Sequence, residues 1–267
     1  MHVLITGATG GIGQGICESL CQAYPSIYPD LHLTVTSSTE GERLQTLVHR
    51  LRATGVSVQG LSGDVTQHQV CEQLVRDAVR VHGDIDALVC VAGASGPGKL
   101  ESLPVEQWDM TFHLNVRSVW VMAKAAFESL KKTQGSITAI ASMSGLSPHP
   151  GYGAYSPAKA ALIMLCRQLA QEWGCLGIRA NTVCPGMIRT PLTEAVYQDE
   201  HIKQQREALV PMHRIGRADD IGEAVKYLIS PQASYVNGQN LVVDGGISDH
   251  MLSMIPGRPG KTAVVNS

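Results

Sequence analysis

Short runs of apolar and β-branched residues recur along the chain and alternate with longer segments in which apolar residues recur every three to four positions. The short runs predict strands, and the longer segments predict amphipathic helices. The predicted strands cover residues 2–6, 31–36, 56–61, 85–92, 136–141, 178–184 and 239–243. The predicted helices cover residues 12–23, 41–54, 67–82, 105–132, 153–174 and 218–229.

This alternation of strand and helix is typical of a parallel sheet covered on both faces. We therefore expect a doubly wound α/β fold, with a seven-stranded parallel sheet as the middle layer of a three-layer α/β/α sandwich. Residues 1–246 are expected to form a single domain. Residues 187–217 interrupt the alternation with mixed charged and apolar residues, and predict a mobile cover near a site. Residues 247–267 are expected to form a C-terminal tail.

Composition narrows the class of protein. The chain has 267 residues, of which 44% are hydrophobic and 16% charged, as is typical of a folded globular protein. A net charge of -2 offers no basic surface for nucleic acid or for an anionic membrane, so small molecules are the expected partners. The seven cysteines are scattered without CxxC spacing, which argues against a metal site. No secretory pattern or long apolar run is visible, and we expect a cytoplasmic protein.

A glycine-rich stretch, TGATGGIG at residues 6–13, lies between the first predicted strand and the first predicted helix. In a strand–turn–helix unit, glycines let the backbone approach a pyrophosphate, and the free amides and dipole of the helix N-terminus favour its charge. This context predicts a dinucleotide-binding turn.

A second candidate feature is the pair Tyr155 and Lys159, which lie four residues apart and so share one face of a helix. Pro157 is compatible with that helix if it lies in the first turn. A nearby ammonium favours the phenolate and lowers the pKa of a tyrosine, so Tyr155 could exchange a proton. The alternative is a partly buried tyrosine beside a solvated lysine.

Further motifs favour the interpretation that Tyr155 exchanges a proton beside Lys159. They are TGxxxGxG at the first turn, Asp64 in GDV, VAGA after the fourth strand, Asn115, Ser142, Tyr155-x-x-x-Lys159, CPGMIRT and VVDGG. In these motifs the chain resembles the short single-domain subgroup of the short-chain dehydrogenase/reductase family. The resemblance implies a Rossmann fold with strand order 3-2-1-4-5-6-7, bound NAD or NADP, and a homotetramer built through two long helices, or else a homodimer.

The resemblance also implies roles for four catalytic residues. Tyr155 is the general acid in carbonyl reduction and the general base in alcohol oxidation, and Lys159 lowers its pKa and holds the nicotinamide ribose. Ser142 polarises the substrate carbonyl, with Ser144 as the alternative. Asn115 holds a water beside the lysine, unless it is a surface or capping residue.

The cofactor contacts implied by the resemblance lie in the glycine turn, at the end of the second strand and in the loops after later strands. They are Gly7, Thr9, Gly11, Ile12, Gly13, Ser37, Ser38, Asp64, Val65, Ala92, Gly93, Tyr155, Lys159, Pro185, Gly186, Ile188 and Thr190. Asp64 could also cap the next helix through Thr66. Cys90 and Val91 replace the two asparagines usual in the family, which weakens the expected bracing of this loop.

The second strand bears on the choice of cofactor. An acid at its end would bind the ribose 2′-hydroxyl of NAD, but none occurs before Glu40. The hydroxyls of Ser37 and Ser38 suit a 2′-phosphate, so NADP is favoured over NAD, with Arg43 as a candidate cation. Against this, Gly11 stands where NADP enzymes often have a basic residue.

We therefore expect an NAD(P)-dependent alcohol dehydrogenase or ketone reductase that acts on a small carbonyl or alcohol. One alternative is a 3-oxoacyl-thioester reductase of fatty-acid or polyketide type. The other is a non-catalytic cofactor-binding regulator, which would be expected to lose Tyr155 or Lys159. Residues 93–100, 146–152 and 187–212 should bound the substrate pocket. Within them, His149 and Tyr152 either contact a polar group of the substrate or simply pack.

Overall fold

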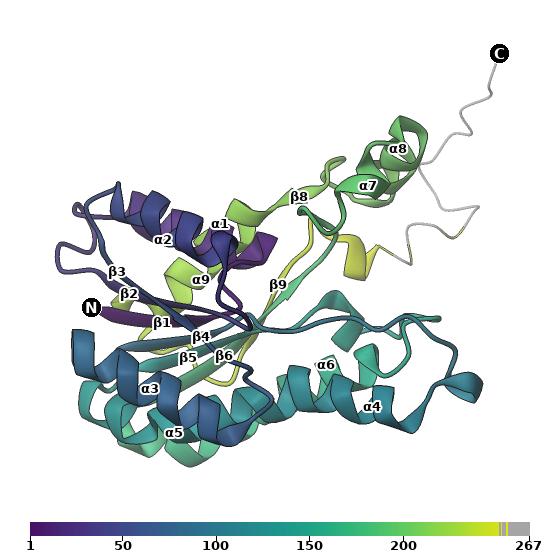
Figure 1. Cartoon of the computed structure of the whole chain (residues 1–267). Coiled ribbons are helices and arrows are strands. Elements are labelled where there is room, and N and C mark those ends of the chain that lie inside the picture. The colour runs from purple at the N-terminus through teal and green to yellow at the C-terminus, as the bar shows by residue number, and fades with distance from the viewer. Residues whose placement is uncertain (251, 253–254, 256–267) are drawn as a thin grey trace.

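The computed structural model describes residues 1–250, 252 and 255. Its middle layer is a parallel sheet (Figure 1) made of β1 (His2–Thr6), β2 (His32–Ser37), β3 (Ser57–Ser62), β4 (Ala87–Cys90), β5 (Ser136–Ile140), β6 (Arg179–Pro185) and β9 (Asn240–Val243). The strand order is β3-β2-β1-β4-β5-β6-β9, and every neighbouring pair is parallel. The predicted sheet is confirmed, and its strand order reverses between β1 and β4, where such folds bind ligands.

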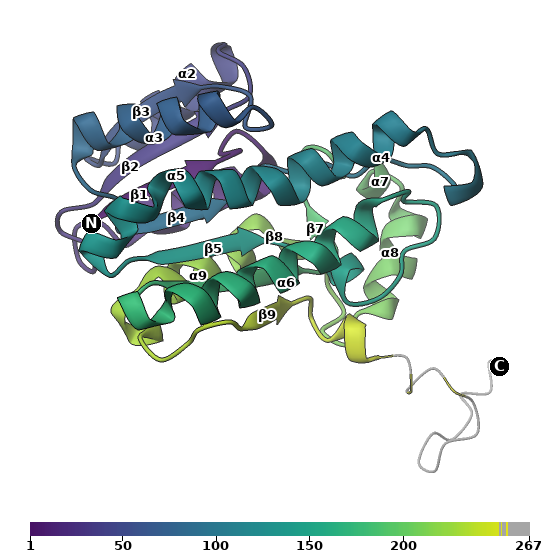
Figure 2. The ribbon, with the colours of Figure 1, turned by 90° about the horizontal axis from the view of Figure 1, so that it is seen from below.

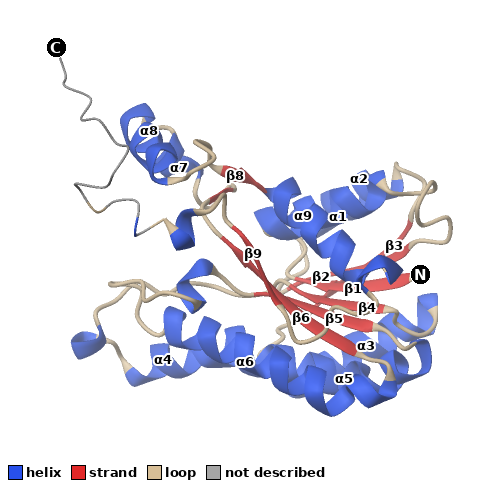
Figure 3. Ribbon diagram, turned by 180° about the vertical axis from the view of Figure 1, so that it is seen from behind, coloured by secondary structure: helices blue, strands red, loops and turns tan. Residues whose placement is uncertain are grey.

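Helices cover both faces of the sheet, as the views from the front and from below show (Figures 1 and 2). One face carries α1 (Gly11–Gln22), α2 (Glu42–Arg52) and α9 (Ala218–Ile229). The other carries α3 (His68–His82), α5 (Ser118–Thr133) and α6 (Tyr155–Trp173). The three-layer arrangement expected from the alternating pattern is therefore present, and Figure 3 shows it from behind.

Two apolar cores lie on the two faces of the sheet. Along β1, Val3 and Ile5 belong to the core beneath α1 and α9, whereas Leu4 belongs to the core beneath α3, α5 and α6. Successive side chains of a strand point to opposite faces, so a buried parallel strand needs apolar residues at consecutive positions. Each fully buried side chain of this size stabilises the fold by about 1.5–3 kcal/mol. The continuous run at residues 2–6 follows from this double burial.

One predicted helix is wrong in detail. The segment expected as a single helix over residues 105–132 consists of α4 (Val105–Phe112), a π-helical turn η2 (His113–Arg117) and α5. A π-helical turn is wider than an α-helical one, and such turns occur frequently at functional sites. Asn115 lies in this turn and is buried.

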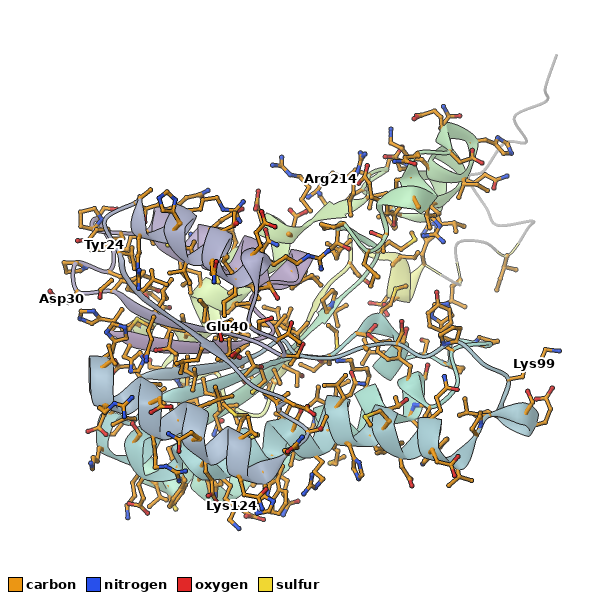
Figure 4. All side chains as sticks on the ribbon, viewed as in Figure 1. Tyr24, Asp30, Glu40, Lys99, Lys124 and Arg214 are labelled. Carbon is orange, nitrogen blue, oxygen red and sulfur yellow. The ribbon has the colours of Figure 1, made fainter. Side chains whose placement is uncertain are left out.

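The predicted cover has its own secondary structure. It contains β7 (Ile188–Arg189), α7 (Glu194–Tyr197), α8 (Glu200–Leu209) and β8 (Gly216–Arg217), with β7 and β8 paired in parallel as a stem. Figure 4 shows Arg214 near the base of this cover, where its guanidinium binds both carboxylate oxygens of Asp220 at 2.7 and 2.8 Å. The cover is thus a folded extension beyond the carboxyl ends of the strands.

Little of the predicted tail can be placed. Residues 247–249 form a short 3-10 turn, η6 (Ile247–Asp249), and most of the following residues lie outside the described part of the chain. Over the part that is described, no helix has both the length and the apolar character needed to span a bilayer.

Candidate active site

The glycine turn after β1 is held by close backbone approach. Gly7 has φ +66°, and a Cβ at this position would lie 2.7 Å from the backbone of Ala92. A Cβ at Gly13 would overlap the carbonyl oxygen of Gly7. Gly10, the N-cap of α1, has no side chain to bind the first helical amides, which include that of Ile12. The turn therefore leaves amides open at a helix N-terminus, where a phosphate is favoured.

A hydroxyl braces the loop after β4, which lacks the two asparagines of the family pattern. Thr6 Oγ1 accepts hydrogen bonds from the amides of Val91 and Ala92, at 3.2 and 3.4 Å. Thr6 is the last residue of β1 and pairs with Cys90 of β4. Sequence reasoning missed this role, although a threonine at the end of a strand beside β4 is a usable signal.

A pocket of about 690 Å³ opens beside the glycine turn. Its lining residues come from the turn, from α2 and from the start of the cover, and are Thr9, Gly10, Gly11, Gln14, Glu42, Arg43, Thr46, Leu47, Arg50, Pro191 and Leu192. The lining positions on α2 follow helical spacing, which would have identified Arg50, Thr46 and Leu47 from the sequence. Gln14, Pro191 and Leu192 were also missed.

The two arginines of this pocket differ in their contacts. Arg50 forms an ion pair with Glu18 at 2.8 Å and donates to Gln14 Oε1 at 2.9 Å. The guanidinium of Arg43 forms neither a hydrogen bond nor an ion pair with any residue that the structure describes. At the end of β2, Ser37 is buried and its hydroxyl accepts from Thr9 Oγ1 at 3.2 Å, while Ser38 is exposed.

Asp64 bonds to Thr66 in the turn before α3 but does not cap that helix, whose N-cap Gln67 has no side-chain cap. Its Oδ1 accepts from the Thr66 amide at 2.9 Å and from the Thr66 hydroxyl at 2.8 Å. These bonds hold the pKa of the Asp64 carboxyl below its usual value. Arg117 of the π-helical turn donates to the Thr66 carbonyl at 2.8 Å, so it links the Asp64 turn to the segment that holds Asn115. Val65 is buried.

Two serines follow β5, and their contacts distinguish them. Ser142 Oγ accepts from the Ser144 amide at 3.1 Å, which caps a short 3-10 turn, η3 (Met143–Gly145). Ser142 also lies close enough to Tyr155 to lower the pKa of its phenol. The Ser144 hydroxyl instead lies 3.1 Å from His149 Nδ1. Ser142 is thus the serine beside the phenol.

Lys159 lies beneath Tyr155 on the same face of α6. Its Nζ is 5.6 Å from the centre of the Tyr155 ring and donates to the Ile140 carbonyl at 2.8 Å. Only 3% of Lys159 is exposed, and burial lowers its pKa to about 8. Because α6 begins at Tyr155, Pro157 lies in the first turn, as predicted. The lysine is therefore a buried cation rather than a solvated one.

The side chains of Asn115 and Lys159 both lie next to Gly93. The Asn115 side-chain amide donates to the carbonyls of Ala94 and Thr111 at 2.9 and 3.0 Å. Its Oδ1 is buried without a hydrogen-bond partner among the described residues. A Cβ at Gly93 would lie 2.7 Å from Oδ1 and 3.2 Å from Lys159 Nζ, so both groups border the same small volume. An unpaired buried acceptor is costly, which argues that this position receives a polar group.

The pKa of Tyr155 differs in direction from the sequence-based expectation. Burial raises the pKa of the phenol, and the hydrogen bond with Ser142 opposes that rise without reversing it. The expected net lowering by Lys159 was therefore wrong, because desolvation of the phenolate is the largest effect. The phenol carries its proton at neutral pH.

The loop after β6 completes the edge of the site. Pro185 ends β6, and a Cβ at Gly186 would lie 2.6 Å from Asp244 Cβ. The buried Ile188 uses its carbonyl to accept from Thr193. Thr190 lies against the glycine turn, since a Cβ at Gly11 would lie 2.6 Å from Thr190 Cβ.

The predicted residues therefore gather at the carboxyl ends of the central strands. Contacts join Ser142, Tyr155 and Lys159, and Asn115 meets the lysine at Gly93. The cofactor candidates line the edge from β2 through β1 and β4 to β6. The open amides of α1, the adjoining pocket and the unpaired Asn115 oxygen fit a dinucleotide that extends across β1 and β4.

Comparisons with known proteins agree with this geometry. The family model described as enoyl-(acyl carrier protein) reductase matches residues 7–248. Dehydrogenase/reductase SDR family member 4 of Bos taurus is 33% identical over 250 residues, which cover 93% of this chain and 87% of that protein. A short-chain type dehydrogenase/reductase from Mycobacterium ulcerans has a solved structure with a TM-score of 0.85 at 28% identity, covering 92% of this chain and 89% of that chain.

A second solved structure is that of a single-residue variant of the actinorhodin polyketide ketoreductase with NADPH. It has a TM-score of 0.85 at 32% identity and covers 93% of this chain and 97% of that chain. The chain belongs to the short-chain dehydrogenase/reductase family of NAD(P)-dependent oxidoreductases.

Proposed function

We propose that this protein reduces a ketone to a secondary alcohol, or catalyses the reverse reaction, with Tyr155 as the general acid or base. The placement of Ser142 and Tyr155 together, beside the buried Lys159, is the observation that carries this proposal. A bound nicotinamide supplies or accepts the hydride. The phenol gives its proton to the oxygen of the substrate as negative charge develops there, and proton transfer of this kind contributes about 10²–10⁴ in rate.

The neighbouring groups act on that proton and on the developing charge. Ser142 is placed to hydrogen bond with the same oxygen, and a positioned donor of this type stabilises an oxyanion. Lys159 holds positive charge near the phenol, which favours the phenolate left after the transfer. Gly7, Gly11 and Gly13, with the open amides of α1, are the candidate pyrophosphate contacts.

The activity can be tested with a panel of ketones, secondary alcohols and acyl thioesters, by following nicotinamide absorbance with NADPH and with NADH. We expect turnover of ketones or alcohols. Relatives named as dehydrogenases favour this activity over 3-oxoacyl-thioester reduction. Turnover of acyl thioesters alone would favour that alternative, and cofactor binding without any turnover would favour a regulator.

We infer a preference for NADP over NAD. Arg43 faces the pocket beside the glycine turn without a partner among the described residues, and the hydroxyls of Thr9 and Ser37 lie nearby. The polyketide ketoreductase of similar structure was solved with NADPH, which supports the same choice. No acidic residue occurs at the end of β2 to repel a 2′-phosphate.

Substitution of Arg43 tests this preference. Hydrogen bonds to charged groups contribute about 1.5–3 kcal/mol, so Arg43→Ala should raise KM for NADPH by about tenfold or more and change KM for NADH little. Arg80→Ala is the control, since Arg80 lies on α3 and pairs with Asp77 at the surface. A wild-type preference for NADH of tenfold or more would contradict the inference.

We also infer a homotetramer, with a homodimer as the alternative, built through the face of α5 and α6. Trp120 on α5 and Met164 on α6 are exposed there, together with Trp108 of α4. An apolar pocket of about 390 Å³ adjoins Trp120 and Leu165. Exposed apolar surface of this kind marks protein interfaces. Trp120→Glu should dissociate the oligomer in light-scattering measurements, and a monomeric wild-type protein would contradict the inference.

A cytoplasmic location remains part of the proposal. Six of the seven cysteines are buried and free, which suits a reducing compartment. Cell fractionation would test it, and recovery in a secreted fraction would contradict it.

A further inference from the structure

The loop between β5 and α6 carries an aromatic pair that proton transfer does not use. The rings of His149 and Tyr152 are stacked, with centroids 3.7 Å apart and an interplanar angle of 22°. The Tyr152 ring lies 6.5 Å from the ring of Tyr155. A flat aromatic surface therefore adjoins the proposed proton donor.

Hydrogen bonds fix this pair in place. The His149 amide donates to Ser156 Oγ at 3.1 Å, and the His149 ring lies 3.1 Å from Ser144 Oγ. The Tyr152 amide donates to the His149 carbonyl at 3.3 Å, and the Tyr155 amide donates to the Tyr152 carbonyl at 3.0 Å. A surface held at several points loses little conformational entropy when a ligand binds.

The same contacts join the aromatic pair to the catalytic serine. The Ser144 amide donates to Ser142 Oγ, and Ser142 adjoins Tyr155 and lowers the pKa of its phenol. The five residues therefore form a closed circuit, from Tyr155 through Ser142, Ser144, His149 and Tyr152 back to Tyr155. A carbonyl that reaches Ser142 and Tyr155 has a substituent within reach of the Tyr152 ring.

The segment facing this loop has small residues. Gly98 donates to the Gly151 carbonyl and accepts from the Gly153 amide, each at 2.9 Å. A Cβ at Gly153 would lie 2.9 Å from the Gly96 carbonyl oxygen. The glycines bring the two backbones together, with the side chain of Leu103 against Gly98 and Gly153, and the aromatic pair supplies the ring surface of this wall.

The charges around the pocket favour a neutral substrate. In the cover, Arg189 pairs with Glu194 at 2.6 Å and Lys203 pairs with Glu200 at 3.1 Å. Arg214 pairs with Asp220, as described above. Lys99, the cation of residues 93–100, lies at the outer end of that loop (Figure 4). Arg206, also in the cover, lies over the ring of Tyr197 and pairs with no carboxylate among the described residues. The paired cations are therefore not arranged to bind a carboxylate or phosphate of the substrate.

We propose that His149 and Tyr152 form a specificity-determining wall that selects neutral ketones with a flat ring next to the carbonyl. This inference rests on the ketone reduction proposed above. Tyr152 keeps 36% of its surface exposed, so its ring can offer a face or an edge to the substrate while it stacks on His149. Aromatic pairs favour offset-stacked or edge-to-face arrangements, which contribute about twofold to tenfold in affinity beyond the area that they bury, and a branched alkyl group cannot make this contribution.

Steady-state kinetics with two probes test the proposal. Acetophenone carries a ring next to its carbonyl, and 3-methyl-2-butanone carries a branched alkyl group at the same place. The wild-type protein should have the higher kcat/KM for acetophenone. Tyr152→Leu should lower that value by about tenfold and change the value for 3-methyl-2-butanone by less than about twofold, whereas Tyr152→Phe should keep the ring preference.

Two further variants complete the design. His149→Ala removes the other ring of the stack and should lower the ratio of kcat/KM for acetophenone to kcat/KM for 3-methyl-2-butanone. The proposal can therefore be tested even if Tyr152→Leu does not fold. Tyr235→Leu is the control, because Tyr235 is fully exposed and its segment contacts the amino end of β6, at the other end of that strand from the active site. It should change neither rate constant.

The outcomes separate this proposal from the proposed function. The proposed specificity wall would be wrong if Tyr152→Leu and His149→Ala lowered kcat/KM equally for both ketones, or if the wild-type protein showed no preference for the ring. Either result would leave the proposed ketone reduction unaffected. Bound NADPH without turnover of either ketone would overturn the proposed substrate class. Failure to bind either nicotinamide cofactor would contradict the proposed function itself.

Discussion

Tyr155 lies where burial and hydrogen bonding act on its pKa in opposite directions, and burial has the larger effect. A phenol with a raised pKa holds its proton at neutral pH, which suits donation to a carbonyl oxygen. The reverse reaction needs the phenolate. The buried phenol therefore favours the reducing direction near neutral pH.

This asymmetry predicts opposite pH dependences for the two directions. Below the pKa of Tyr155, the phenolate fraction rises about tenfold for each pH unit, so alcohol oxidation should accelerate with pH from about pH 6 up to the Lys159 pKa of about 8, above which the lysine loses the charge that favours the phenolate. Ketone reduction should not accelerate over the same range. Initial rates in both directions check this prediction, and an oxidation rate that is flat with pH would contradict it.

The π-helical turn η2 and the loop after β4 meet at the unpaired Asn115 oxygen. Gly93 of that loop is the residue on which their contact depends, since any Cβ there would crowd Asn115 Oδ1 and Lys159 Nζ. The turn also carries Arg117, which binds the loop after β3. Two elements distant in sequence thus fix one wall of the site.

Gly93→Ala should therefore lower kcat by about tenfold or more while the protein stays folded, because a methyl group displaces the amide and the ammonium rather than opening the core. Gly41→Ala is a matched control, since a Cβ at Gly41 meets nothing within 4 Å. Circular dichroism and steady-state kinetics measure the two effects. Full activity in Gly93→Ala would contradict the proposed role of this contact.

The elements themselves differ in how far the sequence predicts them. The strands match to within two residues because the central ones are short apolar runs that two helical layers bury, whereas the edge strands β3 and β9 are only partly buried. The π-helical turn was missed because apolar periodicity continues across it. The hydroxyl of Thr6 was missed because its partners, the amides of Val91 and Ala92, are distant in sequence. The site residues Ser142, Tyr155 and Lys159 were found through motif spacing, but the burial that raises the Tyr155 pKa depends on tertiary packing.

Three histidines lie together at the end of the sheet away from the active site, where His2 begins β1, His32 begins β2 and His82 ends α3. His2 is 2% exposed, its ring is 5.3 Å from His82, and His82 stacks on His32 at 5.1 Å. Burial lowers the pKa of His2 to about 4, with smaller lowering by His82 and His32 and opposing effects of the Gly83 carbonyl and Asp86. The fold therefore disfavours protonation of His2.

The whole molecule should consequently lose stability in mild acid. The unfolded chain binds a proton at His2 below a pKa of about 6.5, whereas the folded chain does so only near 4. The contribution is thus fully present above pH 6.5 and is lost between pH 6.5 and 4, with a total of about 3 kcal/mol. Thermal unfolding at several pH values should show this loss, and His2→Gln should reduce it. Equal acid sensitivity of the two proteins would contradict the assignment to His2.

The decisive measurement is a single turnover of Tyr155→Phe with saturating NADPH and a ketone that the wild-type protein reduces. Phenylalanine keeps the ring beside Ser142 and Lys159 and removes only the hydroxyl that carries the proton. We expect NADPH to bind within about threefold of wild type, while cofactor oxidation slows by about 10²–10⁴. A variant that binds NADPH and keeps more than about a tenth of the wild-type rate would show that the proton comes from another group.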